Sequence, residues 1–416
     1  MKNTDLCIRN ILMPDGRVTD ISVDNGRIVH LGAGMPADEI IEGRRRLCMP
    51  GAIDMHVHMR GGPQAYKEDW KSGTKSAVAG GVVMVVDQPN TIPPITTGKR
   101  LLERVREAEE KAYCRFAING GVTPDAEFRD LWASGAMAFG ETFAAASSYG
   151  TALGPEDLRT ALAQVASLGA LVTIHAEEVT PGDDRDLLTH DHLRSAAGEA
   201  RAVRSVSALA PPGCRLHFCH LSSAESVMAA GKTSFEVMPH HLFLSREAFE
   251  KTDARGKVNP PLRSERERKA LWSLWDRIPV IASDHAPHTV REKSEVFTDA
   301  PSGIPGVETM LPLLMAKALS GDITLKSVIE KTVLGPAALL GLTAWRCSPG
   351  DQADLVLYPK VSEMIDPEHL HSKADWSPYE GLDAIFPEEV IINGAPVFSD
   401  GEFFTGQGQW IKGAGA

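Results

Sequence analysis

The 416-residue sequence lacks any run of 18 or more apolar residues, so it offers no candidate for a membrane-spanning helix. Its first residues, MKNTDLCIRN, also lack the apolar region of a secretory signal. Cysteine is scarce, because the chain has six cysteines and no CxxC pair, which argues against a disulfide framework and favours reduced thiols. We therefore expect a soluble cytoplasmic protein without a membrane partner.

An excess of basic residues is missing as well. Lys and Arg number 43 against 55 Asp and Glu, which gives a formal net charge of −12. Binding to nucleic acid needs clustered positive charge, and the one strong basic cluster, GRRR at 43–46, is better explained as a solvated turn. Nucleic acid is thus not an expected partner. The apolar share of 43% and the charged share of 24% are those of an ordinary globular enzyme.

The two ends of the chain share a texture that the middle does not have. Short alternating runs separated by Asp-Gly and Asn-Gly turns occur before residue 48 and return in ADLVLYP and EEVIINGAPVFSDGEFF. Such runs predict small antiparallel strands. We expect residues 1–48 and 346–416 to pair into one small composite β-domain, a β-sandwich, around a larger domain at 49–345.

The middle of the chain alternates short apolar runs with amphipathic stretches such as GKRLLERVREAEEKA, a pattern typical of βα units in a parallel sheet. Eight apolar runs can be counted: AIDMHVH, VVMVVDQPN, RFAINGGV, AMAFGETF, LVTIHAEE, LHFCHLSS, FEVMPHH and PVIASDHAPH. The predicted fold class is therefore α/β, a (β/α)8 TIM-like barrel with the small β-sandwich domain built from both chain ends. Nearly every run ends in a polar residue, where the active sites of this fold lie.

The stretch IDMHVHMR places three useful side chains on one face. Side chains alternate along a strand, so His56, His58 and Arg60 point the same way. A lone histidine is more often a core or surface residue than a ligand. Two on one face, joined by His175, His220 and Asp284 at later strand ends, offer the nitrogen and oxygen donors of a zinc-type site.

These residues also carry a resemblance to a family. The motifs HxHxR, VVDQPNT, IHAEE, HLSS, PHH, KVNPPLR, SDHAPH, GIPGVET, ADLVLY and SPYEG look like those of the cyclic amidohydrolases, and among them most like the dihydroorotases. The resemblance runs from about residue 50 to the final strands. It implies a hydrolase that interconverts dihydroorotate and N-carbamoyl-L-aspartate in pyrimidine biosynthesis, with one or two zinc ions per subunit. The resemblance is also compatible with a homo-oligomer and with an association with aspartate transcarbamoylase.

Matched position by position, the resemblance assigns roles to individual residues. His56, His58, His175 and His220 would bind metal, and Asp284 would be both a metal ligand and the general base. Arg60, Asn90, Asn259 and His288 would contact the substrate, the first two through its carboxylate. A surface salt bridge at the barrel rim is the alternative role for Arg60.

Two departures from the family pattern stand out. Gly61-Gly62-Pro63 replaces the usual Glu-Pro-Gly after the arginine, which leaves the ligands untouched. At the fourth strand Glu141 stands where many relatives carry a lysine carbamate that bridges two metals. We predict that Glu141 binds metal directly, although its shorter reach leaves open a role as a hydrogen-bond partner of a ligand histidine.

Several points stay open from the sequence. A hydantoinase or allantoinase is the closest alternative activity, and a non-catalytic dihydroorotase-like subunit is the alternative from another class. One of His240 and His241 could line the site while the other packs beneath a helix, and His217 is expected to be structural. The loop at 286–305 could cover the site or be an ordinary solvated loop.

Overall fold

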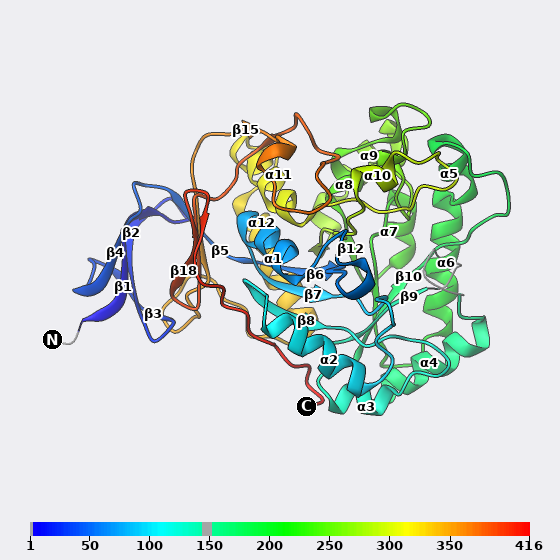
Figure 1. Ribbon diagram of the computed structural model, residues 1–416, viewed down its shortest axis with the longest axis horizontal. Coiled ribbons are helices and arrows are strands. Elements are labelled where there is room, and N and C mark those ends of the chain that lie inside the picture. The colour runs from blue at the N-terminus through cyan, green and yellow to red at the C-terminus, as the bar shows by residue number, and fades with distance from the viewer. Residues whose placement is uncertain (1–2, 144–151) are drawn as a thin grey trace.

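The computed structural model describes residues 3–143 and 152–416. A barrel of strands surrounded by helices fills the larger part of the molecule, and a sheet built from both chain ends projects from one side of it (Figure 1). Over these described ranges, no helix has both the length and the hydropathy that a membrane span requires. The predicted fold class is confirmed.

Eight parallel strands form the barrel, and each one corresponds to a run picked out in the sequence. They are β6 (Ala52–Val57), β7 (Val82–Asp87), β8 (Arg115–Ile118), β9 (Phe139–Phe143), β10 (Leu171–His175), β11 (Arg215–Phe218), β12 (Ser234–Val237) and β13 (Val280–Ile281). Their ladders run in the order β6-β7-β8 and β9 through β13. Parallel bridges from Gly120 to Phe139 and from Val57 to His285 join these two sheets and close the ring. All the carboxyl ends therefore open at one mouth.

Helices surround the strands, and most of them begin at a residue whose side chain caps the first turn. They are α1 (Trp70–Ala79), α2 (Gly98–Glu109), α3 (Phe128–Ala133), α4 (Pro155–Ser167), α5 (Leu187–Leu193), α6 (Ala196–Leu209), α7 (Ala224–Ala230), α8 (Pro239–Phe243), α9 (Glu265–Trp272), α10 (Val290–Lys293), α11 (Val307–Leu319), α12 (Leu325–Ile329) and α13 (Gly335–Leu340). In α2, for example, the Thr97 side chain accepts a hydrogen bond from the backbone N–H of Arg100, while Leu101, Val105 and Ala108 are buried.

Strands from both chain ends share one nine-stranded sheet. They are β1 (Thr4–Leu12), β2 (Val18–Asp24), β3 (Arg27–Gly32), β4 (Ala37–Glu42), β5 (Leu47–Pro50), β14 (Leu355–Tyr358), β17 (Glu389–Ile392), β18 (Ala395–Ser399) and β19 (Glu402–Phe403). The two ends meet where β5 pairs antiparallel with β14. Ile8, Ile21 and Ile28 pack with Leu355 and Ile391 in one core, so the sheet folds over on itself as a sandwich.

Part of the C-terminal segment packs on the barrel instead. The short pair β15 (Glu363–Met364) and β16 (Asp383–Ala384) frames a segment whose Trp376 and Tyr379 share a core with Val258 and Ile304. Near the chain end, the backbone N–H of Phe116 in β8 donates to Gln409 O at 3.0 Å. The domain bounds expected from the sequence remain a prediction.

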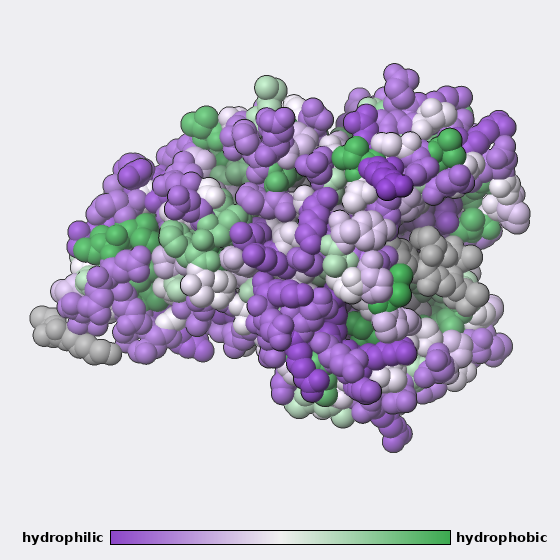
Figure 2. Space-filling model, viewed as in Figure 1, coloured by the Kyte–Doolittle hydropathy of each residue, from purple (hydrophilic) through white to green (hydrophobic). Residues whose placement is uncertain are grey.

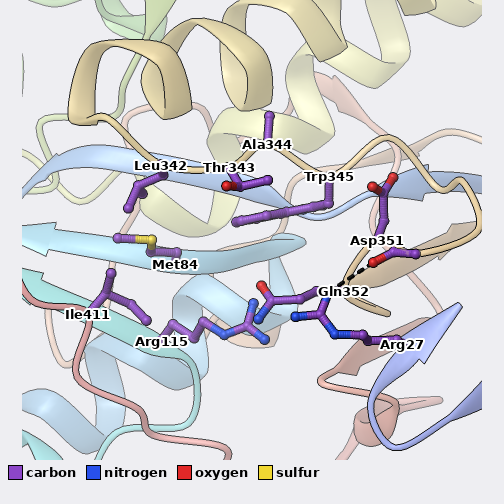
Figure 3. A pocket seen from close by; sticks show the side chains of 11 residues that line it. Arg27, Met84, Arg115, Leu342, Thr343, Ala344, Trp345, Asp351, Gln352 and Ile411 are labelled. Carbon is purple, nitrogen blue, oxygen red and sulfur yellow. Dashed lines mark hydrogen bonds between the residues drawn. The ribbon is translucent and has the colours of Figure 1, made fainter.

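The amino ends of the strands hold a cavity of about 300 Å³ between the barrel and the terminal sheet (Figure 3). Its wall includes Arg27, Arg115 and Trp345, and the Arg115 guanidinium lies 5.8 Å from the centre of the Trp345 ring. Arg115 forms a buried ion pair with Asp354, the residue before β14, and so ties β8 to the terminal sheet.

Polar side chains cover most of the visible surface, and the larger apolar patch in this view lies over the terminal strands (Figure 2). Val18, Val29 and Ile40 are exposed there on β2, β3 and β4.

Candidate metal centre and active site

The two histidines of β6 reach the mouth of the barrel as the strand alternation predicts. His56 and His58 lie at the carboxyl end of β6, and both are buried. Asp54 lies on the same face, two residues before His56. Its carboxylate accepts hydrogen bonds from the backbone N–H groups of His56 (3.2 Å) and Ser283 (3.1 Å). Burial raises the pKa of Asp54 to about 6. Asp54 thus joins β6 to the segment after β13 that carries Asp284.

Glu141 of β9 lies at the centre of the histidines. Its Oε1 atom is 2.8 Å from His175 Nδ1 and 2.7 Å from His220 Nε2. Its Oε2 atom is 3.7 Å from His56 Nε2 and 4.0 Å from His58 Nε2. One carboxylate oxygen therefore faces each histidine pair, which is the arrangement that a carboxylate bridging two cations requires.

The histidines also control the charge of Glu141. Burial raises the pKa of this carboxyl, but the hydrogen bonds from His175 and His220, together with the charge of His220, outweigh the burial and hold the pKa well below its ordinary value. Glu141 is consequently ionised, as a metal ligand must be.

Asp284 follows β13 and completes the ring of donors. Its Oδ1 atom is 3.1 Å from His58 Nε2 and 3.5 Å from His56 Nε2. Burial raises the pKa of Asp284, yet the charge of His56 and the hydrogen bond and charge of His58 outweigh it and bring the pKa to about 2. The carboxylate is therefore ionised at neutral pH.

Three residues of the site bend the backbone where their strands end. Arg60, His220 and Asp284 have φ angles of 46°, 38° and 47°, in the left-handed region that non-glycine residues rarely adopt. Each such residue costs on the order of 1 kcal/mol and persists only where the surroundings enforce it. The shared bend turns these side chains inward across the mouth of the barrel.

The donor set fits metal ions. Two groups of buried donors, His56 with His58 and Glu141, and Glu141 with His175 and His220, each place their ligand atoms within 4.8 Å of one another. His56 Nε2 is buried and has no hydrogen-bond partner among the described residues, which is the condition of a nitrogen reserved for a cation. Imidazole and carboxylate suit a zinc-type ion, and the shared Glu141 allows two ions.

Carboxylates behind the histidines orient their rings, and one of these was missed in the sequence. His56 Nδ1 lies 2.6 Å from Glu236 Oε1 of β12, so His56 Nδ1–H donates to this carboxylate and Nε2 is left for a cation. Glu236 sits within FEVMPHH as the one acidic residue of a buried strand, and that isolation was the available signal. Glu236 also groups with His56 and Cys219 as potential donors.

His175 has carboxylates on both sides. Its Nε2 atom lies 2.5 Å from Glu177, which in turn pairs with Arg194 at 2.5 Å. Burial lowers the pKa of His175, but the charge of Glu177 and the hydrogen bonds to Glu141 and Glu177 outweigh it and raise the pKa to about 9.

The predicted substrate residues fall into two groups. Arg60, Asn90 and Asn259 line one cavity together with part of the candidate metal site. Among the described residues, its wall consists of His58, Arg60, Asn90, Glu141, Phe143, His175, Asn259, Asp284, Ala286, Ser302 and Gly303. Asn90 Oδ1 accepts a hydrogen bond from His58 Nδ1 at 2.9 Å, so Asn90 also orients a metal histidine. His288 is not part of this wall, and it approaches the cavity through Arg60, with Nε2 3.5 Å from Arg60 Nη2.

His240 and His241 lie deeper. Their rings meet edge to face with centroids 4.2 Å apart, and His241 Nε2 donates to Pro260 O at 3.0 Å. Neither residue belongs to the cavity wall. His217 is buried with Nε2 3.3 Å from Glu236, away from the cavity.

Comparison with known proteins agrees with this geometry. Residues 47–395 match the model of the amidohydrolase family. The dihydroorotase of Methanosarcina acetivorans is 38% identical, with 100% of this chain and 95% of the relative covered, and that of Halobacterium salinarum is 39% identical, with 95% and 96% covered.

Solved structures resemble the whole chain as well. The L-hydantoinase (dihydropyrimidinase) of Arthrobacter aurescens superposes with a TM-score of 0.91 at 25% identity, covering 98% of this chain and 100% of that one. The dihydropyrimidinase of Brevibacillus agri gives a TM-score of 0.87 at 26% identity, with 98% of both chains covered. The chain therefore belongs to the amidohydrolase family and is a metal-binding enzyme of the dihydroorotase type.

Proposed function

We propose that this enzyme interconverts (S)-dihydroorotate and N-carbamoyl-L-aspartate in de novo pyrimidine biosynthesis. The observation that carries the proposal is Arg60, whose guanidinium lines the same small cavity as the metal donors His58, Glu141 and Asp284. A planar guanidinium holds a carboxylate through two parallel hydrogen bonds. The dihydroorotate ring carries such a carboxylate on C6, separated by one ring carbon from C4, the carbonyl carbon of the amide that is hydrolysed. The dihydroorotases among the relatives support the same substrate.

The residues divide the work between them. When zinc is bound, one or two ions supply Lewis acidity that polarises the scissile carbonyl and lowers the pKa of a water. His56, His58, Glu141, His175, His220 and Asp284 would hold the metal. Asp284, which is ionised at neutral pH, would accept the proton of the attacking water and return it to the leaving ring nitrogen. Arg60, Asn90 and Asn259 orient the ring, and His288 acts with Arg60.

A second candidate is hydrolysis of an uncharged cyclic amide, as in the hydantoinases and dihydropyrimidinases that the fold resembles. These substrates lack the ring carboxylate that the Arg60 guanidinium in the cavity wall would bind. A site that binds a charged group of its substrate strongly disfavours an analogue that lacks this group.

One experiment separates the two candidates. Purified enzyme of measured metal content is assayed with dihydroorotate, hydantoin and 5,6-dihydrouracil, beside Arg60→Met and the exposed control Arg159→Met. Arg60→Met should lower kcat/KM for dihydroorotate by about a hundredfold or more, because a charge-assisted bidentate contact is lost. The control should match the parent. Faster turnover of hydantoin than of dihydroorotate by the parent would move the assignment to the second candidate.

A further inference from the structure

A lysine is buried next to the substrate side of the site, in the connection between β6 and α1. Lys67 is only 7% exposed, which is rare for a lysine unless its charge is used. Its Nζ atom lies 2.7 Å from Glu292 Oε1 and 3.1 Å from His288 Nδ1. Lys67 therefore connects an acidic residue of α10 to one of the predicted substrate residues.

The contact with Lys67 determines which nitrogen of His288 carries a proton. An ammonium group only donates hydrogen bonds, so His288 Nδ1 must be the acceptor. The competing arrangement, in which Nδ1 donates to Glu292 Oε2, would span 3.6 Å and is too long for a hydrogen bond. With Nδ1 unprotonated, the ring proton lies on Nε2. Burial lowers the pKa of His288 to about 3, which agrees with a neutral ring.

The proton on Nε2 points at another donor. His288 Nε2 and Arg60 Nη2 are 3.5 Å apart, and Arg60 could donate to Nε2 only if that nitrogen carried no proton. The contact of Lys67 with Nδ1 is shorter, at 3.1 Å, and it favours Nδ1 as the acceptor and Nε2 as a second donor beside Arg60. An acceptor that lies against both would receive two hydrogen bonds at once. A carboxylate in the cavity next to Arg60 is an acceptor of this kind.

Gly303 lies between His288 and the cavity. Gly303 belongs to the wall, and a Cβ atom built on it would come within 3.1 Å of His288 Cδ2 and 2.6 Å of Ala286 O. Trp376 Nε1 donates to His288 O at 2.8 Å and fixes the backbone of the histidine. The ring is thus held against the wall from behind, and the glycine leaves room for it.

We propose that Lys67 is a positioning residue for the substrate anion: it holds His288 as the Nε2–H tautomer, so that His288 and Arg60 present two converging donors to the substrate carboxylate. The proposal rests on the proposed function, in which the substrate carries that carboxylate. A purely structural Lys67, which would only pair with Glu292 and close the loop, makes different predictions.

The test compares Lys67→Met, His288→Ala and the double variant, with the exposed lysine variant Lys71→Met as a matched control. We measure KM and kcat for dihydroorotate, the inhibition constant of 5,6-dihydrouracil, metal content and thermal unfolding. Lys67→Met should raise KM for dihydroorotate about ten- to a hundredfold with kcat within about threefold, and leave 5,6-dihydrouracil binding and metal content unchanged. In the His288→Ala background the same substitution should add less than about threefold, because the two residues act as one unit.

Other results would overturn the proposal. Additive losses in the double variant, or equal weakening of dihydroorotate and 5,6-dihydrouracil, would make Lys67 a structural residue. Glu292→Gln removes the ion pair with Lys67 and keeps the contact of Lys67 with His288. A rise in KM equal to that of Lys67→Met would therefore also make Lys67 a structural residue. If Lys67→Met does not fold, Lys67→Gln, whose amide ends one atom short of the ammonium, should show the same selective KM loss.

The failure of the proposed function would look different. If the parent does not turn over dihydroorotate, the substrate assignment falls. The role of Lys67 is then tested by comparing the binding of dihydroorotate and 5,6-dihydrouracil to the parent and to Lys67→Met. An equal effect on both ligands would reject it, and a loss confined to the ring acid would support it.

Discussion

The two ends of the barrel both bury charged side chains, yet they pair them in opposite ways. At the amino ends, Arg115 pairs with Asp354, which also accepts a hydrogen bond from the backbone N–H of Asn393 at 2.7 Å. At the carboxyl ends, the single carboxylate of Glu141 lies within 4.0 Å of nitrogens from four histidines.

The charged residues at the amino ends of the strands therefore serve stability, and those at the carboxyl ends serve function. A one-to-one buried pair neutralises itself and links two parts of the fold, whereas a shared carboxylate among partly unsatisfied nitrogens is complete only when a cation joins it. Substitutions at the amino ends should therefore change the free energy of unfolding, and those at the carboxyl ends should change metal binding and turnover.

The largest effect is expected from the double substitution His56→Ala with His58→Ala. Loss of two ligands should lower kcat/KM by at least about ten-thousandfold, since the metal supplies several kcal/mol of transition-state stabilisation. The barrel should stay folded, as circular dichroism would verify, and metal content should fall. The exposed His192→Ala is the control. Full activity of the double variant, or of metal-free parent, would break the comparison at the carboxyl ends.

The next largest effect should occur at the amino ends. Arg115→Met leaves Asp354 as a buried charge without its arginine, so it should lower the free energy of unfolding by about 3–5 kcal/mol. Denaturant unfolding measures this change, and kcat of the folded enzyme should equal that of the parent. Arg159→Met removes an exposed pair with Glu156 and should cost at most about 1 kcal/mol. A loss of turnover without a loss of stability in Arg115→Met would contradict the division.

Glu141→Gln sharpens the comparison within the metal site. Gln keeps the size of the side chain and removes its charge, so metal stoichiometry should drop if Glu141 binds metal directly. Glu177→Gln is the matched control, because Glu177 contacts His175 Nε2 from outside the donor groups. It should cost only about ten- to a hundredfold in affinity or rate, with stoichiometry retained. Unchanged stoichiometry in Glu141→Gln would reject direct coordination.

The smallest change in stability is expected from Asp69→Asn, which removes the charge of a carboxylate near the mouth of the barrel. Asp69 caps α1 and pairs with Lys373 at 2.7 Å. Burial raises the pKa of Asp69, but the hydrogen bonds from Lys373 and from the backbone N–H of Ser72 outweigh it and lower the pKa to about 2. Asp69→Asn should cost about 1 kcal/mol at pH 7 with unchanged kcat.

The pH dependence of that cost has a definite sign. A carboxyl group whose pKa is lower in the folded state stabilises the fold above its unfolded pKa of about 3.9, and the contribution is lost as the pH falls. The difference in unfolding free energy between parent and Asp69→Asn should therefore shrink between about pH 4 and pH 2. A difference that stays constant over this range would show that the carboxylate charge contributes nothing.

Most of the barrel could be read from the sequence because its signals are local. Each of the eight runs became a strand, and the alternation in IDMHVHMR placed His56 and His58 on one face. Four of the described strands were not anticipated: β4, β5 and the short pair β15 and β16. The acidic residues of β4 hide its alternation, and β5 is a four-residue run without a polar partner face.

Some residues of the site could not be predicted from local pattern. Glu236 meets His56 across 180 residues of sequence, and Lys67 meets His288 across 221. Neither residue has a periodic signature, because a positioning contact depends on which loops and strands the closed barrel brings together. The sequence motif predicts that His288 contacts the substrate, and only the structure places its ring next to Arg60 and Gly303, beside the cavity.

The sequence by itself determined the order of strands and helices, the pairing of the two chain ends and the types of side chain at the carboxyl end of each strand. These follow from alternation, turn residues and the rule that parallel strands present their carboxyl ends at one edge. Only the tertiary structure decided that Glu141 lies between two histidine pairs and that His288 lies between Lys67 and Arg60. Both depend on distances of a few ångströms between residues of different strands, which closure of the barrel sets and no local pattern encodes.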